Sequence, residues 1–217
     1  MNGSKTGLRL TYFTDPLCCW SWALEPVWQQ VRETWQGQLQ WRYVMGGLIK
    51  DWSSYRDTMQ AVSRPVQMGP VWLEAKYASG QPFNEKIWIT DPPASSWPAC
   101  LAVKCAGMQG KEEEMLFALR YAVMAGGRNI ARKEVLISVA EGAGLDMDQF
   151  RKDLVSPVAS AALQADMNEA QLKGIHRYPT FILAMDGRPG VLFTGYRPAE
   201  AWHSIIKDYL EGQESAA

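Results

Sequence analysis

Two stretches with the alternating pattern of β-strands flank a helical segment at the start of this 217-residue chain, which limits the folds it can adopt. Side chains alternate from Leu8 to Thr14, and a second alternating run covers residues 38–45. Between them, apolar residues recur at steps of three and four over residues 24–35, and Pro26 predicts a kink in that helix. A strand, a helix and a strand in this order favour a parallel strand pair.

The far end of the chain predicts two more strands of the same layer. Residues 180–185 and 191–194 flank a turn, which is the pattern of a hairpin, and an amphipathic helix follows them. Between the two ends, about a hundred residues show helical spacing with Gly and Pro at the breaks. We therefore expect an α/β domain formed by residues 1–50 and 156–217, with residues 51–155 inserted as an all-helical domain.

Charge and composition exclude several classes of protein. The 22 Lys and Arg residues balance 23 Asp and Glu residues, so neither nucleic acid nor an anionic membrane is an expected partner. No apolar run has the length of a membrane span, the first ten residues lack the pattern of a signal peptide, and we expect a cytoplasmic protein. Four cysteines are too few for a disulfide scaffold, and two histidines without paired cysteines do not favour a zinc site. No sequence feature sets an oligomeric state.

Cys18 lies where the first strand ends and the first helix begins. Unpaired backbone N–H groups and the helix dipole stabilise an anion at that position, so we expect the pKa of Cys18 to lie below that of a free thiol. A thiolate is the nucleophile of disulfide exchange, which makes Cys18 a candidate catalytic residue. The alternative is that Cys18 is a small buried residue of the core.

Two separated segments resemble those of a known family. Residues 13–22, Phe-Thr-Asp-Pro-Leu-Cys-Cys-Trp-Ser-Trp, are similar to the active-site segment of DsbA-like proteins of the thioredoxin superfamily, especially the cytoplasmic branch of predicted protein-disulfide isomerases. Residues 174–181 resemble the loop that carries the superfamily's cis-proline. The resemblance implies a thioredoxin-like fold with an inserted helical domain, Cys18 as the nucleophile, and Tyr178 and Pro179 as the wall of a groove for an extended substrate. The alternative for Pro179 is an ordinary trans proline at the start of an edge strand.

The sequence departs from the family's Cys-x-x-Cys motif at the fourth position, which is Ser21. A serine cannot resolve a mixed disulfide, and a bridge from Cys18 to the adjacent thiol of Cys19 would be strained because adjacent Cα atoms are only ~3.8 Å apart. Ser21 is better placed to donate a hydrogen bond to the Cys18 thiolate. These three residues are the candidate catalytic group. We expect thiol–disulfide oxidoreductase or isomerase chemistry through one cysteine, completed by an external thiol.

The arrangement of one reactive cysteine with Ser21 predicts the binding partners, and two functions other than oxidoreductase remain as alternatives. Protein or small-molecule thiols and disulfides are the expected partners, with glutathione as a candidate co-substrate and no tightly bound cofactor. One alternative is a glutathione-dependent transferase or isomerase that resembles the kappa class. The other is a non-catalytic binding protein, because some cytoplasmic relatives of this fold act as adaptors that present a regulator to a protease.

Four other residues near the two segments are candidates for the site. Trp20 and Trp22 flank Cys18 and are expected to form an apolar platform for substrate. His176, in the proline loop, is either a group that stabilises the thiolate or a surface histidine. Glu25, about two helical turns after Cys18, is either a proton relay or a solvated helix residue.

Overall fold

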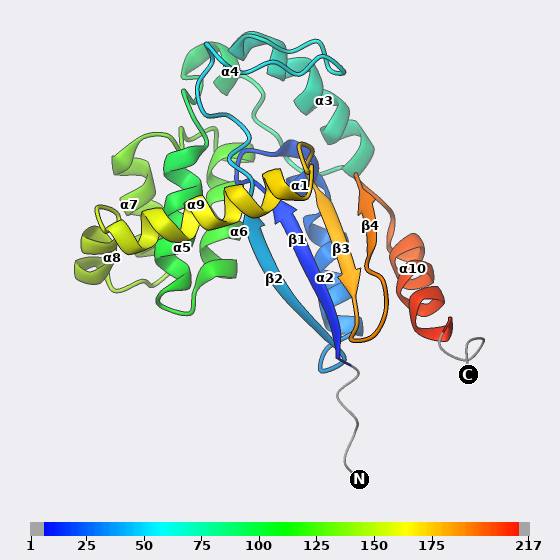
Figure 1. The fold of residues 1–217 in the computed structure, drawn as a ribbon. Coiled ribbons are helices and arrows are strands. Elements are labelled where there is room, and N and C mark those ends of the chain that lie inside the picture. The colour runs from blue at the N-terminus through cyan, green and yellow to red at the C-terminus, as the bar shows by residue number, and fades with distance from the viewer. Residues whose placement is uncertain (1–6, 213–217) are drawn as a thin grey trace.

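A four-stranded sheet lies at the centre of the fold in the computed structural model, which describes residues 7–212 (Figure 1). In sheet order the strands are β2 (Leu39–Met45), β1 (Leu8–Thr14), β3 (Thr180–Ala184) and β4 (Val191–Thr194). β1 pairs with β2 in parallel and with β3 in antiparallel orientation, and β3 and β4 form an antiparallel hairpin. The predicted parallel pair and hairpin are confirmed, and strands from both ends of the chain share one sheet.

The two faces of the sheet bury different residues because side chains alternate along each strand. Tyr12 belongs to the larger buried cluster, whereas the next residue, Phe13, belongs to a smaller cluster on the other face. The larger cluster is covered by α2 (Glu25–Thr34) and α10 (Ala199–Glu211), and the smaller one by α9 (Pro157–Leu172).

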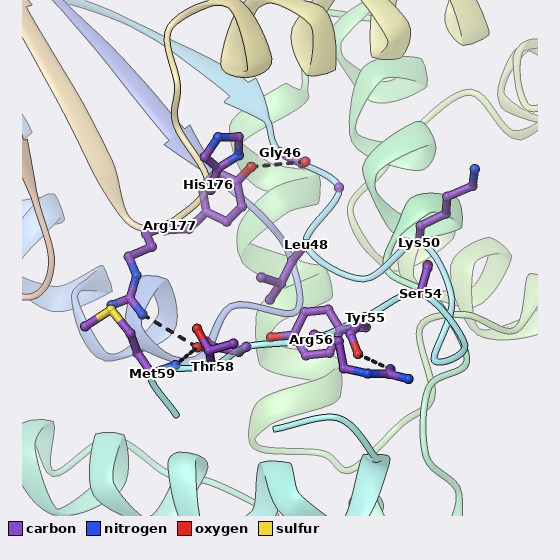
Figure 2. A pocket seen from close by; sticks show the side chains of 13 residues that line it. Gly46, Leu48, Lys50, Ser54, Tyr55, Arg56, Thr58, Met59, His176 and Arg177 are labelled. Atoms are coloured by element: carbon purple, nitrogen blue, oxygen red, sulfur yellow. Dashed lines mark hydrogen bonds and ion pairs between the residues drawn. The ribbon is translucent and has the colours of Figure 1, made fainter. Parts of the chain in front are cut away.

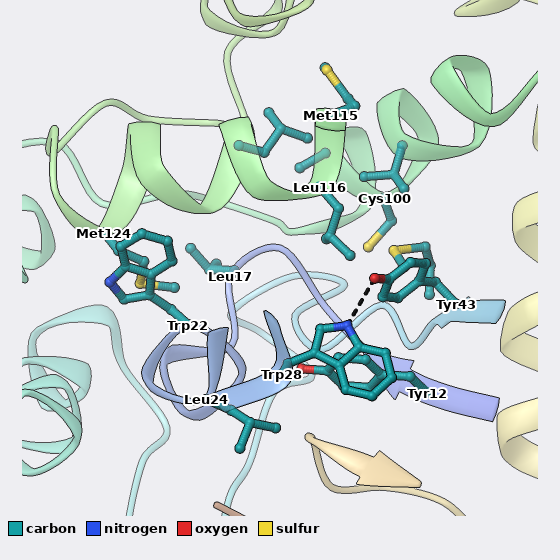
Figure 3. Packing of buried hydrophobic residues seen from close by; sticks show 14 of the residues in the cluster. Tyr12, Leu17, Trp22, Leu24, Trp28, Tyr43, Cys100, Met115, Leu116 and Met124 are labelled. Atoms are coloured by element: carbon teal, nitrogen blue, oxygen red, sulfur yellow. Dashed lines mark hydrogen bonds between the residues drawn. The ribbon is translucent and has the colours of Figure 1, made fainter. Parts of the chain in front are cut away.

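Aromatic rings fill the space between the sheet and its covering helices. The ring of Trp28, in α2, lies 5.5 Å from that of Tyr12, and its indole N–H donates to the hydroxyl of Tyr43 at 3.0 Å (Figure 3). On α10, the ring of Trp202 lies 4.5 Å from that of Phe181. Large aromatic side chains bury roughly 150–250 Å² each, so this cluster fixes α2 firmly against the sheet.

The predicted kinked helix is two helices, α1 (Cys19–Ala23) and α2, with the break at Leu24. The N–H of Leu24 donates to the carbonyl of Trp20, while the carbonyl of Leu24 accepts from Trp28 at 2.9 Å. Pro26 lies in the first turn of α2, where the missing N–H group leaves no helical hydrogen bond unmade. The proline therefore separates α1 from α2, and Cys18 precedes a short helix of its own.

The inserted segment is helical and shares a core with the sheet. It contains η1 (Pro65–Gln67), α3 (Met68–Ser79), α4 (Ile87–Thr90), α5 (Trp97–Gly107), α6 (Glu112–Met124), α7 (Lys133–Gly142) and α8 (Met147–Asp153). One buried apolar cluster runs through both parts, and Figure 3 shows Leu116 of α6 above the segment that carries Leu17 and Trp22. α9 joins the two parts, because it packs on β2 and on α5. Within residues 7–212, none of the helices has the length and apolar character to cross a membrane.

Candidate active site around Cys18

Cys18 is the N-cap residue of α1 and follows β1 after a tight turn. Its N–H donates to the carbonyl of Asp15 at 3.1 Å, and its own carbonyl accepts from the N–H of Trp22 at 3.1 Å. The N–H of Leu17 donates to Asp15 Oδ1 at 2.8 Å, which is a second hydrogen bond within the same turn. These bonds hold the Cys18 sulfur at the carboxyl end of β1.

The proline loop meets Cys18 from the other end of the sequence. The Tyr178–Pro179 peptide bond is cis, and Cys18 Sγ donates to the carbonyl oxygen of Tyr178 at 3.3 Å across 160 residues of chain. The hydroxyl of Tyr178 donates to the carbonyl of Gly46 at 3.1 Å. A Cβ atom at residue 46 would lie 2.0 Å from Tyr178 Cζ, so only glycine leaves room for the ring there.

A cavity of about 450 Å³ opens beside Cys18, and both parts of the chain line it. Cys19 and Trp20 contribute from α1, and His176 and Tyr178 from the proline loop. The inserted part and the segment after β4 complete the walls with mostly apolar side chains, among them Tyr55, Val62, Met68, Val71 and Tyr196. A cavity of this size accommodates a small thiol or one peptide segment.

Trp22 lies outside this cavity, unlike Cys19 and Trp20 of the same helix. Its side chain is buried, its indole N–H donates to the carbonyl of Pro82 at 3.0 Å, and its ring packs against Phe117 and Tyr121. The structure therefore gives Trp22 a place at the interface with the inserted helices rather than on the expected substrate platform.

A second cavity, of about 470 Å³, adjoins the first. Tyr178 lines both cavities, and so do Asp57 and Arg177, which form an ion pair at 3.6 Å. Figure 2 shows Arg177 and the proline loop on one side of this cavity and Arg56 on the other. The walls here are more polar than those beside Cys18, so an occupant of both cavities meets an apolar part and a polar part.

Burial raises the pKa of the Cys18 thiol, so the prediction of a lowered pKa is wrong. The residue is only 5 % exposed, and the negative charge of Asp15 acts in the same direction as burial. Hydrogen bonds from Ser21 and the positive charge of Arg120 lower the pKa but do not reverse the effect of burial. A five-residue helix has few aligned peptide dipoles, and loss of solvation outweighs them.

Cys19 is the less reactive of the two adjacent thiols. Its side chain is 4 % exposed, and burial together with the neighbouring Cys18 raises its pKa well above the ordinary value. Because the thiolate is the form that attacks a disulfide, Cys18 is the better candidate nucleophile.

Ser21 connects Cys18 to a buried arginine through one further hydroxyl group. The hydroxyl of Thr14, the last residue of β1, donates to Ser21 Oγ at 2.9 Å. Arg120, on α6 of the inserted part, donates from Nη2 to Thr14 Oγ1. Its side chain is 1 % exposed. The inserted helices thus supply a positive charge close to the site.

Glu25 is buried and paired, so its interpretation as a solvated helix residue is wrong. Its Oε2 accepts from Arg120 Nη1 at 2.6 Å, and its Oε1 lies 3.8 Å from Arg32 Nη2. The role of Glu25 as a proton relay stays a prediction, and the structure places Arg120 and Thr14 between it and Ser21.

Asp15 is a second buried charged group beside the site, and burial raises its pKa. Its carboxylate accepts four hydrogen bonds, from Leu17 N (2.8 Å), Leu48 N (2.7 Å), Ser96 Oγ (2.8 Å) and Cys100 Sγ (3.2 Å). These donors come from the active-site turn, the loop after β2 and the start of α5. Asp15 therefore ties the inserted part to the turn that carries Cys18.

The sequence analysis missed both Asp15 and Arg120 as site residues. Arg120 had a visible signal, because it lies within the apolar face that Leu116 and Val123 mark on α6, and a charge in that position predicts a buried ionic partner. Asp15 lies within the quoted segment, three residues before Cys18, but nothing in the sequence indicates its burial. In the described part of the chain, no group of three or more His, Cys, Asp or Glu residues is placed to hold a metal ion.

Comparisons with known proteins agree with this geometry. A family model described as thioredoxin matches residues 12–203. The ClpXP adapter protein SpxH of Halalkalibacterium halodurans is 30 % identical over 207 residues, which cover 94 % of this chain and 68 % of that protein. SpxH of Bacillus subtilis is 29 % identical over 212 residues, with 95 % and 69 % covered.

Solved structures share the fold at lower identity. A candidate protein disulfide isomerase from Nitrosomonas europaea gives a TM-score of 0.80 at 23 % identity, with 94 % of this chain and 98 % of that chain covered. The cytosolic disulfide reductase DsbM from Pseudomonas aeruginosa gives 0.72 at 23 % identity with the same coverage. Its structure with GSH gives 0.69 at 22 % identity, with 94 % and 99 % covered. The thioredoxin-like fold with a helical insertion is therefore confirmed.

Proposed function

This chain belongs to the thioredoxin family, and we propose that it is a DsbA-like member that catalyses thiol–disulfide exchange through Cys18 alone. The observation that carries the proposal is the meeting of Cys18 with the proline loop. The sulfur lies 3.3 Å from the carbonyl oxygen of Tyr178, beside a cavity that can hold a substrate segment. Ser21 stands where a second thiol would resolve the product of the first step.

The reaction has two exchange steps. The Cys18 thiolate attacks one sulfur of a substrate disulfide, forms a mixed disulfide with it and releases the other sulfur as a thiolate, which takes up a proton. An external thiolate then attacks the substrate sulfur of the mixed disulfide. This second step restores the Cys18 thiolate and leaves the substrate joined to the external thiol. Because Ser21 carries no sulfur, the second step depends on that external thiol.

Tyr178 links substrate binding to the protonation state of Cys18. An extended substrate is expected to run along the Tyr178 main chain as an added strand does, with its N–H directed at the Tyr178 carbonyl. That N–H competes with the Cys18 thiol for the same oxygen. Substrate binding therefore favours loss of the thiol proton, which offsets the raised pKa of Cys18 in the free protein.

Glutathione is the external thiol that we propose, in a cytosolic setting. The two adjoining cavities of about 450 and 470 Å³ offer space for a tripeptide next to Cys18. The DsbM reductase with the same fold is described as cytosolic and has been solved with GSH, which supports this choice.

Mass spectrometry after incubation with oxidised glutathione tests the reactive cysteine. We expect one glutathione adduct per chain, located at Cys18 by peptide mapping. The variant Cys18→Ala should take up none, and the matched variant Cys19→Ala should take up one. An adduct on Cys19, or no adduct on the unmodified chain, would contradict the proposal.

Insulin reduction tests the single-cysteine mechanism. We expect weak activity from the native sequence and an increase in Ser21→Cys, because that variant can resolve the mixed disulfide within the chain. Ser21→Ala is the matched control that changes the same position without adding a thiol, and it should show no increase. Equal activity of Ser21→Cys and the native sequence would show that position 21 does not limit the reaction.

A second candidate function is that of a protease adaptor. The two relatives named ClpXP adapter protein SpxH that are described above match 94–95 % of this chain at 29–30 % identity. The raised pKa of Cys18 makes the free thiol a poor nucleophile. Degradation by purified ClpXP of a protein that an SpxH adapter delivers to it distinguishes the two functions. A rate increase by this chain that persists in Cys18→Ala would establish the adaptor function without thiol chemistry.

A further inference from the structure

Arg120 is a buried arginine from the inserted helices that reaches the polar groups behind Cys18. Arg120 lies on α6, 106 residues after Thr14 and 95 residues after Glu25 in the sequence. Burying a guanidinium is costly unless its N–H groups find acceptors. Arg120 has two such acceptors, Thr14 Oγ1 and Glu25 Oε2, and its cation also lies 5.7 Å from the centre of the Tyr12 ring.

The hydrogen-bond directions along this chain of groups follow from the number of protons available. A guanidinium carries only donors, so Thr14 Oγ1 must accept from Arg120. The single hydroxyl proton of Thr14 is then directed at Ser21 Oγ, 2.9 Å away. Ser21 Oγ accepts that proton, which leaves its own hydroxyl proton free for another acceptor. The Cys18 sulfur is the acceptor within reach, because Cys18 is the N-cap residue of α1 and Ser21 is the third residue of that helix, and the neighbouring Ser21 lowers the pKa of Cys18.

We propose that Arg120 is a positioning residue, which orders the hydroxyl groups of Thr14 and Ser21 so that Ser21 donates to the Cys18 sulfur. This inference rests on the proposed function, because it gives Ser21 a role at the reactive cysteine in place of a second thiol. The helical insertion thereby supplies a group that the sheet domain lacks at this point.

The arrangement positions a proton and does not pass one. The guanidinium of arginine keeps its protons at any physiological pH, so Arg120 interrupts a proton path from Glu25 to Ser21. Glu25 acts as the counter-charge that makes burial of Arg120 tolerable, with Arg32 at 3.8 Å as its second partner.

Several charged and titratable groups face Cys18 and must be kept constant in a test. Asp15 lies in the turn before it, Cys19 follows it on α1, Arg120 faces it from α6, and Tyr178 faces it from the proline loop. Tyr55, in the loop after β2, also interacts with it electrostatically. Substitutions at Thr14 and Ser21 leave all of these charges in place.

The test is a double-mutant cycle read through the pH dependence of alkylation. The variants Thr14→Val, Ser21→Ala and their combination are made in a Cys19→Ala background, and the rate of carboxamidomethylation of Cys18 by iodoacetamide is measured from pH 6 to pH 11. Each single variant should raise the pKa of Cys18 by about one unit, or slow alkylation about tenfold at neutral pH. The double variant should match Ser21→Ala alone, because Thr14 acts only through Ser21.

Two matched variants separate this role from a general loss of packing. Thr14→Ser keeps the hydroxyl and should restore the native alkylation profile within about twofold. Thr11→Val makes the same change as Thr14→Val in the same strand, on the sheet face that Phe13 shares rather than the face of Thr14, and should leave the profile unchanged. Effects of Thr14→Val and Ser21→Ala that add, or a native profile in Thr14→Val, would overturn the proposal.

The result of this alkylation test does not depend on whether the proposed disulfide exchange occurs. Iodoacetamide reacts with the Cys18 thiolate without disulfide exchange, so the cycle can be read even if oxidised glutathione forms no adduct. Direct removal of Arg120 is expected to destabilise the fold, and the Thr14 and Ser21 variants keep the test independent of that effect.

Discussion

Replacement of Arg120 by methionine should destabilise the protein strongly, because it leaves Glu25 buried without its nearest counter-charge. Arg120 Nη1 lies 2.6 Å from Glu25 Oε2, and the side chains of the two residues are 1 % and 9 % exposed. Removing one partner of a buried ion pair costs about 3–5 kcal/mol. Arg32 remains 3.8 Å from the other carboxylate oxygen and offsets part of the loss. We therefore expect Arg120→Met to lower the free energy of unfolding by about 3 kcal/mol.

The double variant Arg120→Met, Glu25→Met shows whether the loss comes from the unpaired charge. With both charges gone, two apolar side chains of similar volume fill the same space, so most of the stability should return, to within about 1.5 kcal/mol of the native chain. The remaining loss reflects the donor that Thr14 no longer has and the lost contact with the Tyr12 ring.

Urea unfolding followed by tryptophan fluorescence measures these differences, with equal m-values as the condition for comparing midpoints. Arg32→Met is the comparison, because Arg32 is the more distant and more exposed partner of Glu25. Arg32 also pairs with Glu113, which is 35 % exposed, and its removal should cost less than that of Arg120. A loss below about 1 kcal/mol in Arg120→Met, or a double variant as unstable as the sum of its single changes, would refute the reasoning.

Three further predictions concern the surroundings of the site. In Gly46→Ala, the new methyl group would lie 2.0 Å from Tyr178 Cζ and displace that ring, so glutathionylation of Cys18 should slow about tenfold in a mass-spectrometric time course. An unchanged rate would show that the position of the Tyr178 ring does not affect the reaction. Asp15→Asn removes a negative charge that raises the pKa of Cys18, so alkylation at pH 7 should become faster, and a slower reaction would contradict this. Burial raises the pKa of Cys105 from 9.0 to about 12, so the unfolded chain releases that proton first and stability falls as pH rises above 9. Cys105→Ala should reduce that slope by up to about 1.4 kcal/mol per pH unit in urea unfolding between pH 9 and pH 11, whereas equal slopes would exclude this contribution.

Most of the fold could be predicted because its elements have clear local patterns. The period-two stretches became β1 and β2 in parallel and the hairpin of β3 and β4, as the alternation indicated. Helix α3 was not placed in advance, because Gly69 and Pro70 in its first turn weaken the helical signal. Its residues Met68 and Val71 nevertheless line the cavity beside Cys18.

Local patterns predicted the candidate site only where its residues share a segment, whereas Tyr178 and Pro179 were expected only through the resemblance to a family. Cys18, Trp20 and Ser21 are neighbours in sequence and stay neighbours in space. Glu25 was expected two turns along the helix of Cys18, but it is the first residue of the separate helix α2, and its burial depends on Arg120, which lies 95 residues later in the chain. A periodic pattern shows which side of a helix is apolar, but it does not show which distant charge will pack against it.

By itself, the sequence determined the kinds of elements, their order, the interruption of an α/β layer by helices, and two adjacent cysteines at the start of a helix with a serine three residues after the first. These properties depend on steric periodicity and on residue spacing, both of which are local. Only the tertiary structure decided that Cys18 meets Tyr178, that Arg120 reaches Thr14, and that the pKa of the thiol moves upward. Solvation and Coulomb interactions depend on every group packed around an atom, and most of those groups come from distant parts of the chain.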